Sequence, residues 1–231
     1  MAIKCPGSMI MWQPKPEIFR CQSCGHEVEI WTDEIKVTCR NCNQVVSKYI
    51  DMSCIEWCKL AKECVGEGQF NKYMKNRVRS VKEKLLQFLD EHFGTDIKRI
   101  EHAQKVLKYA EDILMAEDGD SHIVIPAAIL HDVGNKENEE DHARVGADIA
   151  RKLLLKHGFQ IDHIDEICDI ILHHHLRDEA GRKNYRIIFD ADRLVNFKDE
   201  IHNLDKKKIE SKINTSCLTS TGKELARKIY L

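Results

Sequence analysis

Apolar residues recur at three- and four-residue steps along most of this chain, which is the pattern of amphipathic helices. The longest such stripe covers residues 70–93, with Lys, Arg and Glu between its apolar positions. It predicts a helix of about six turns that ends at Gly94. A second stripe over residues 97–114 predicts another helix, with Thr95 as its N-cap.

Shorter periodic segments predict the rest of a helical body. The apolar run 126–130 suits a buried helix with Gly134 as its stop, and the periodic segment from residue 142 suits a helix that Gly158 stops. Asp162 is placed to cap the next helix, and a terminal helix closes the chain.

The beginning of the chain has a different pattern. Val, Ile, Trp and Thr are frequent between Cys24 and Cys39, which predicts a β-hairpin there, and Gly66-Glu-Gly68 marks a boundary. The predicted fold is therefore mainly α, with a small β domain at residues 1–68 and a body of about six helices at residues 69–231.

Two Cys-x-x-Cys pairs flank the predicted hairpin. Cys21, Cys24, Cys39 and Cys42 can present four thiolates to one tetrahedral Zn²⁺, as in a zinc ribbon, and such closed sites are structural. Redox-active pairs are the alternative, but they belong to a βαβ context that this segment lacks.

A second cysteine set follows the first. Cys54, Cys58 and Cys64 supply three thiolates. Cys5 is the remaining cysteine of residues 1–68, which we call the head, and it could supply a fourth. A second Zn²⁺ and a [4Fe–4S] cluster are both occupants that four thiolates accept, and free buried cysteines are the alternative.

Composition and charge indicate the compartment of the protein and the classes of partner it can bind. Eight of the ten cysteines precede residue 65, which in a reducing compartment indicates metal binding rather than disulfides. The net charge of −2 gives no electrostatic argument for a nucleic acid or a membrane as partner. No apolar run approaches the roughly 20 residues that span a bilayer, and the first residues lack the apolar core of a signal peptide. We therefore expect a soluble cytoplasmic protein.

Polar residues that bind metals follow several of the apolar runs. His131 and Asp132 stand side by side where the apolar run 126–130 ends. A buried carboxylate needs a partner, and a divalent cation would accept both side chains together. Single candidates of the same kind accompany other predicted helices, namely His102, His142, His174 and Asp192.

In this order the residues resemble the signature of the HD superfamily of metal-dependent phosphohydrolases, over roughly residues 95–230. The motifs that carry the resemblance are Ile100-Glu-His102, Ala128-Ile-Leu-His131-Asp132-Val-Gly134, His142 with Gly146-Ala147, Ile170-Ile-Leu-His-His174, and Asp190-Ala-Asp192-Arg193-Leu194. The resemblance implies an HD-type helical bundle that holds two divalent cations, for which Mn²⁺, Fe²⁺, Ni²⁺ and Zn²⁺ are the candidates.

The resemblance also assigns the ligands. His102, His131, Asp132 and Asp192 would hold the first metal, with Asp192 rather than Asp190 as the closing aspartate. Asp132 would bridge to a second metal held by His142 and by His174, the member of the run 173–175 that the apolar register turns inward. A register shift of one residue would select His173 or His175 instead.

The implied activity is hydrolysis of a nucleotide or another small phosphate ester by metal-activated water. Arg193 or Lys136 would neutralise a phosphate oxygen, although Arg193 has an alternative role in a structural ion pair. Asn135 replaces the lysine that many two-metal members carry after His-Asp-x-Gly. The Gly-Tyr-Pro triplet of cyclic-di-nucleotide phosphodiesterases is absent after His174, so that substrate is not expected.

Two other functions remain open at this point. HD-like oxygenases hold an iron pair with nearly the same ligands, and an iron–sulfur cluster in the head would give electrons a relay. A binding module that senses a nucleotide is the third reading. In that case the ribbon would contact a partner, although its basic residues are offset by acidic ones and form no stripe for nucleic acid. The sequence leaves the oligomeric state open.

Overall fold

The structure is a computed structural model that describes residues 14–32, 34, 36–47, 55, 61–136, 141–177, 182–202 and 204–231, except for the side chains of residues 64, 65 and 136. The chain divides into two compact units, residues 1–81 and 82–231. The division falls within helix α4 (Glu67–Phe93), whose first turn contains the predicted domain boundary at residue 68.

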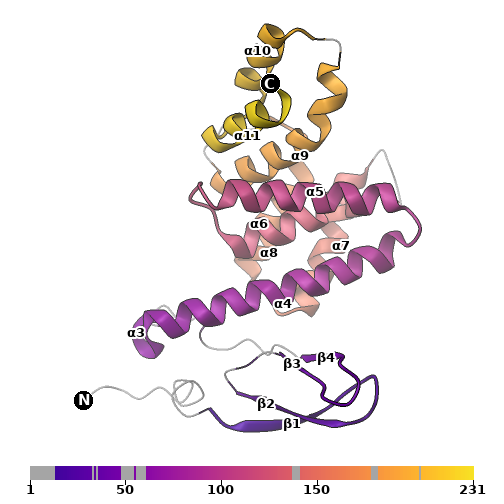
Figure 1. The fold of residues 1–231 in the computed structure, drawn as a ribbon, viewed down its shortest axis with the longest axis vertical. Coiled ribbons are helices and arrows are strands. Elements are labelled where there is room, and N and C mark those ends of the chain that lie inside the picture. Colours follow the sequence, from indigo (N-terminus) through magenta and orange to yellow (C-terminus); the bar gives the residue numbers. More distant parts are fainter. Residues whose placement is uncertain are drawn as a thin grey trace. The chain divides into compact units, whose positions relative to one another are not determined.

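The described part of the first unit contains two short antiparallel hairpins (Figure 1). Strand β1 (Pro16–Arg20) pairs with β2 (Glu27–Trp31), and β3 (Lys36–Thr38) pairs with β4 (Val45–Ser47). The prediction of a single hairpin between the two cysteine pairs was wrong, because each pair instead forms the turn of its own hairpin. Each turn is closed by the backbone: the N–H of Cys21 donates to the carbonyl of His26, and that of Cys39 donates to the carbonyl of Gln44.

The remaining regular elements of the described chain are helices, so the prediction of a mainly α fold with a small N-terminal β part is confirmed. After α3 (Ala61–Val65) and α4 come α5 (Ile97–Leu114), α6 (Ser121–Leu130), the 3₁₀ turn η1 (Val133–Lys136), α7 (His142–Lys156), α8 (Ile161–His173), α9 (Lys183–Ile201), α10 (Lys206–Ser216) and α11 (Ser220–Tyr230). Within the described residues, no helix has the length and apolar character needed to cross a bilayer.

Two predicted caps differ from the observed ones. Asp96, rather than Thr95, caps α5, because its carboxylate accepts the backbone N–H of Arg99. Helix α8 follows Gln160, which makes no side-chain cap, and Asp162 lies in the first turn. An acidic side chain there still interacts favourably with the helix dipole.

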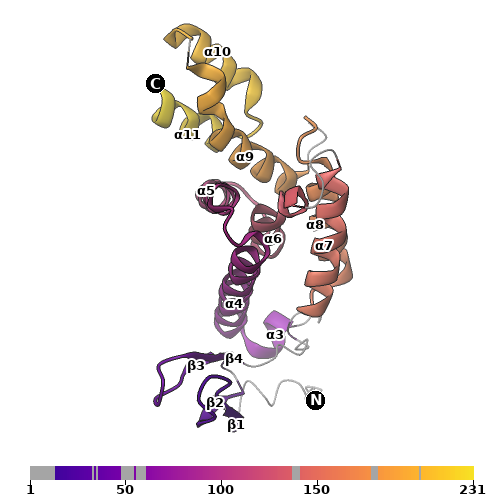
Figure 2. The same cartoon turned by 90° about the vertical axis from the view of Figure 1, so that its right-hand side faces the viewer.

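Helix α6 is the centre of the second unit. Every residue from Ile123 to Leu130 is buried, and α6 packs against α5, α8 and α9. Figure 2 shows α5 on one side of α6 and the pair α7 and α8 on the other. Because α6 has no polar face, its position is determined by burial on all sides, and so is the position of the residues that follow its last turn.

Asp190 ties α9 to the C-terminal helices. Its fully buried carboxylate accepts the backbone N–H groups of Leu218 and Thr219, each at 2.7 Å, and the hydroxyl of Thr219 at 2.6 Å. Burial raises the pKa of Asp190, against the opposing effect of these donors. Asp190 therefore has a structural role. Asp192 is the acid of this pair that contacts His102 on α5.

Replacing Asp190 is expected to lower stability while sparing the predicted metal site. Asp190→Asn exchanges one acceptor oxygen for an amide and leaves a buried donor without an acceptor, which should cost about 1–3 kcal/mol in the free energy of unfolding. Urea unfolding measures this loss. The variant should bind as much Mn²⁺ as the parent does, and a loss of bound metal as large as that in Asp192→Asn would contradict the structural assignment.

Candidate metal centre

Two groups of metal-binding side chains lie next to each other in the helical body. The first is His102 on α5, His131 at the end of α6 and Asp192 on α9; the second is Asp132, His142 at the start of α7, and His174 and His175 just after α8. Within each group, one ligand atom per residue lies within 4.8 Å of all the others. All six residues predicted for the two metals are brought together here.

Asp132 faces both groups with different oxygens. Its Oδ2 lies 3.6 Å from His102 Nε2 and 3.5 Å from His131 Nε2, whereas its Oδ1 lies 3.4 Å from His174 Nε2 and 3.9 Å from His142 Nε2. This is the placement that a carboxylate bridging two cations requires. Asp192 completes the first group, with Oδ1 3.1 Å from His102 Nε2, and the amide of Asn196 donates to that same oxygen at 2.9 Å.

Two of the histidines are oriented by a hydrogen bond to a backbone carbonyl of the preceding helical turn. His131 and His174 each follow the last residue of a helix, and their Nδ1 atoms lie 2.9 Å from Ala128 O and 2.6 Å from Ile171 O. A carbonyl only accepts, so Nδ1 must carry the proton in both rings. In the neutral ring this leaves the Nε2 lone pair facing the centre, as metal ligation requires.

Glycine contacts set the distance between η1 and α7. A Cβ atom at Gly134 would lie 2.1 Å from the carbonyl oxygen of His142 and 2.5 Å from the amide nitrogen of Gly146. Only glycine allows this backbone approach. It brings the turn that follows Asp132 against the first turns of α7, and therefore brings His142 near the Asp132 carboxylate.

The electrostatics of the centre fit a bound cation. Burial opposes the ionisation of Asp132, but the neighbouring imidazoles outweigh it and hold the pKa of Asp132 well below its usual range. Burial lowers the pKa of His131. For His174, burial also opposes protonation, yet Asp132 raises its pKa. Among the described residues, Asp132 Oδ1 and His174 Nε2 are buried without a hydrogen-bond partner. A cation between them would satisfy both atoms, so the donor set fits the implied metal.

His175 is the donor that the sequence did not assign. Its Nε2 lies 2.9 Å from His142 Nε2, within the second group. Extending the register of α8 directed one imidazole, that of His174, inward. Helix α8 ends at His173 and His174 keeps helical φ and ψ angles, so the register of α8 does not decide the direction of His175. His173 remains on the helix, with Nδ1 3.0 Å from Asp169 Oδ1. The run of three histidines at a helix end was the only sequence signal for His175.

The predicted phosphate-binding residues have different outcomes. Arg193 Nη2 donates to Glu200 Oε2 at 2.9 Å and lies 3.5 Å from Ser216 Oγ, which is the structural ion pair considered as its alternative role. The side chain of Lys136 lies outside the described residues, as do Cys5, Cys54 and Cys58 and the side chain of Cys64. Predictions for these residues remain predictions.

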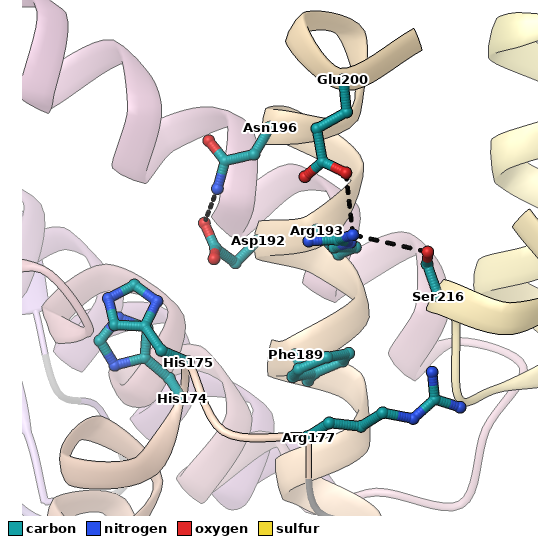
Figure 3. A pocket seen from close by; sticks show the side chains of 9 residues that line it. All are labelled: His174, His175, Arg177, Phe189, Asp192, Arg193, Asn196, Glu200 and Ser216. Atoms are coloured by element: carbon teal, nitrogen blue, oxygen red, sulfur yellow. Dashed lines mark hydrogen bonds and ion pairs between the residues drawn. The ribbon is translucent and has the colours of Figure 1, made fainter. Parts of the chain in front are cut away.

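A cavity of about 320 Å³ adjoins the second donor group. It is lined by His174, His175, Arg177, Phe189, Asp192, Arg193, Asn196, Glu200 and Ser216. Figure 3 shows the two histidines and the Asp192 carboxylate on one side, and Arg177, Arg193 and Ser216 on the other. The cavity thus offers room for a small molecule beside the metal-binding atoms.

The four cysteines of the ribbon form a separate group. Cys21 Sγ lies 3.5 Å from Cys42 Sγ, and Cys24 Sγ lies 3.7 Å from Cys39 Sγ. Sulfurs at about 2.3 Å from a tetrahedral Zn²⁺ are about 3.8 Å apart, so the cluster fits that ion. Hydrogen bonds from the Asn41 side chain and the His26 backbone lower the pKa of Cys24 to about 6, which favours its thiolate. Despite a hydrogen bond from the Gln44 backbone, the neighbouring Cys24 and burial raise the pKa of Cys42 to about 12, so a bound cation is needed to hold both as thiolates.

Comparison with known proteins places the helical centre in a family context. Residues 99–197 match the family model of the HD domain. The chain is also similar to the crystal structure of a predicted HD superfamily hydrolase from an uncultured Thermotogales bacterium. The TM-score is 0.51 with 29% sequence identity, and the match covers 64% of this chain and 84% of that chain.

Gly134→Ala tests the approach of η1 to α7. The added Cβ meets backbone atoms that cannot rotate away, so η1 must shift and separate Asp132 from His142. We expect weaker binding at the second donor group, measured by Mn²⁺ titration. Gly68→Ala is the matched control, since a Cβ there has nothing within 4 Å. Equal Mn²⁺ affinity in the two variants would contradict the proposed role of Gly134.

Cys39→Ser tests whether the ribbon and the helical centre bind metal independently. Removal of one of four thiolates should release the ribbon metal and unfold the head, because two short hairpins have too small a core to stay folded without the ion. Zinc released to a colorimetric chelator and Mn²⁺ bound to the body are both measured. Cys168→Ser, at a buried cysteine outside the cluster, serves as control. Loss of Mn²⁺ binding together with zinc would show that the two sites depend on each other.

Proposed function

Because residues 99–197 match the family model of the HD domain, we propose that the protein is a metal-dependent hydrolase and that the bond it cleaves is a phosphate ester of a small molecule such as a nucleotide. The similarity to a predicted HD superfamily hydrolase supports the reaction class. The observation that carries the proposal is the position of Asp132, whose two oxygens face two separate donor groups.

The donor set favours an anionic substrate. Two bound cations would lower the pKa of a water molecule and neutralise charge on phosphoryl oxygens. Among the described residues, the donors include two carboxylates, Asp132 and Asp192, and the other donors are imidazoles. The loaded centre would therefore retain positive charge, which attracts a phosphate group. The imidazoles of His131 and His174 are fixed by backbone carbonyls, so the centre is preorganised.

The cavity supports a small substrate. A volume of about 320 Å³ lies at the lower end of the range for ligand pockets, which begins at about 300 Å³. A single nucleotide suits this size better than a dinucleotide or a nucleic acid strand. Phe189 offers an apolar wall for the part of the substrate beyond the phosphate, and Arg177 and Arg193 offer positive charge. Glu200 already pairs with Arg193, so a substrate oxygen would share this guanidinium with it.

We assign a structural Zn²⁺ to the ribbon, on the basis of the spacing of its four sulfurs. Four thiolates complete the coordination of that ion and leave no position for a substrate. In this proposal the ribbon stabilises the head, and hydrolysis takes place in the helical body.

Phosphate release by metal-loaded protein tests the proposal. Protein loaded with Mn²⁺, Fe²⁺, Ni²⁺ or Zn²⁺ is assayed with nucleoside mono-, di- and triphosphates and with a generic phosphodiester. We expect turnover of at least one ester with at least one of these ions. The ester that reacts fastest would begin to define the substrate.

Asp132→Ala is the decisive variant for this assay. It removes the carboxylate that faces both donor groups, so we expect loss of both metals from the body and loss of turnover. Asp148→Ala, at an exposed acid on α7, should behave as the parent does. Unchanged metal content in Asp132→Ala would overturn the bridging role. Oxygen consumption by iron-loaded protein without phosphate release would instead support the oxygenase, and nucleotide binding without turnover would support a sensing module.

A further inference from the structure

The 3₁₀ turn η1 is held from two sides immediately after the bridging carboxylate. On one side Gly134 packs against the backbone of α7. On the other side the carbonyl of Val133 lies 2.9 Å from Nε2 of His92, near the end of α4. A carbonyl cannot donate, so His92 Nε2 carries the proton and donates to it. The turn itself is closed by the Asn135 N–H, which donates to the carbonyl of Asp132 at 3.0 Å.

The ring of His92 is itself held in place. It stacks on Phe88, with ring centroids 5.4 Å apart and planes at 26°, and it meets the edge of Phe93 at 5.0 Å. Leu89 and Phe93 on the same helix segment are buried. This part of α4 is also tied to α5, because Lys82 Nζ lies 2.6 Å from Glu111 Oε1. The donor therefore has a defined direction.

We propose that His92 is a positioning residue for the metal centre, acting on Asp132 through the carbonyl of Val133. This inference rests on the proposed two-metal site and extends it to a residue that lies before the matched segment 99–197. With η1 fixed between His92 and the backbone of α7, the Asp132 carboxylate is directed between the two donor groups. Hydrogen bonds that orient metal ligands from outside the ligand set typically change metal affinity 10–100-fold when they are lost.

A matched pair of substitutions isolates the hydrogen bond. His92→Met and His92→Gln both remove the ring and its contact with Phe88, and their side chains have similar length, but only glutamine has an N–H donor. Mn²⁺ alone is the probe, titrated into metal-free full-length protein by calorimetry or by electron paramagnetic resonance. Thermal unfolding of the metal-free variants is recorded in parallel.

We expect Mn²⁺ binding to be about 10-fold weaker or more in His92→Met, while His92→Gln stays close to the parent. His122→Met controls for the loss of a partly buried histidine at the opposite end of α6, and it should lower the unfolding temperature without changing Mn²⁺ affinity. Equal Mn²⁺ affinity in His92→Met and His92→Gln would overturn the inference and leave His92 with a packing role only.

The same titration separates this inference from the proposed function. If Asp132→Ala loses Mn²⁺ binding but His92→Met does not, the metal centre stands and the role of His92 is wrong. If Asp132→Ala binds Mn²⁺ as the parent does, the two-metal site itself is wrong and the inference falls with it.

Discussion

The placement of the half-buried Asp132 carboxylate among imidazoles, with its Oδ1 fully buried, is the constraint on which the helical body depends. A carboxylate in this position is costly unless positive charge accompanies it. The fold brings donors to it from α5, α6, α7, the end of α8, and α9. These helices meet at one point because α6 is apolar on all sides and must be surrounded. Packing thus determines where α6 ends, and its end determines where the acid lies.

Helix ends, rather than helix faces, supply most of this centre. His131, Asp132, His174 and His175 all follow the last regular turn of a helix, and His142 begins one. Residues at such positions leave carbonyls of the preceding turn without helical partners. The centre uses two of these carbonyls to fix the tautomers of His131 and His174. The same hydrogen bonds therefore satisfy carbonyls at the end of each helix and orient the imidazole that follows it.

The sequence predicted the fold class and the ligand candidates because both depend on local patterns. Apolar periodicity located the helices, and polar groups beside apolar runs indicated His131, Asp132 and the pair Asp190 and Asp192, from which the resemblance to the HD signature selected Asp192. The sequence did not predict the features that depend on where a helix or strand ends. The sequence did not assign His175 because the register of α8 gives one inward position, and α8 ends at His173. The two hairpins of the head were predicted as one because the sequence pattern does not show the backbone hydrogen bonds that close a turn at each cysteine pair. Contacts between distant segments, such as that of His92 with Val133, leave no trace in local periodicity.

Asp190 and Asp192 divide two tasks within a single turn of α9. Two positions along a helix place side chains on nearly opposite faces, so Asp190 faces the start of α11 while Asp192 faces His102. This has a consequence for synthesis. Every candidate ligand of the centre is translated before Thr219, yet the buried Asp190 acquires its donors only when Leu218 and Thr219 have been made. On a nascent chain, the helix that carries Asp192 therefore gains this anchor only after all the candidate ligands have been made.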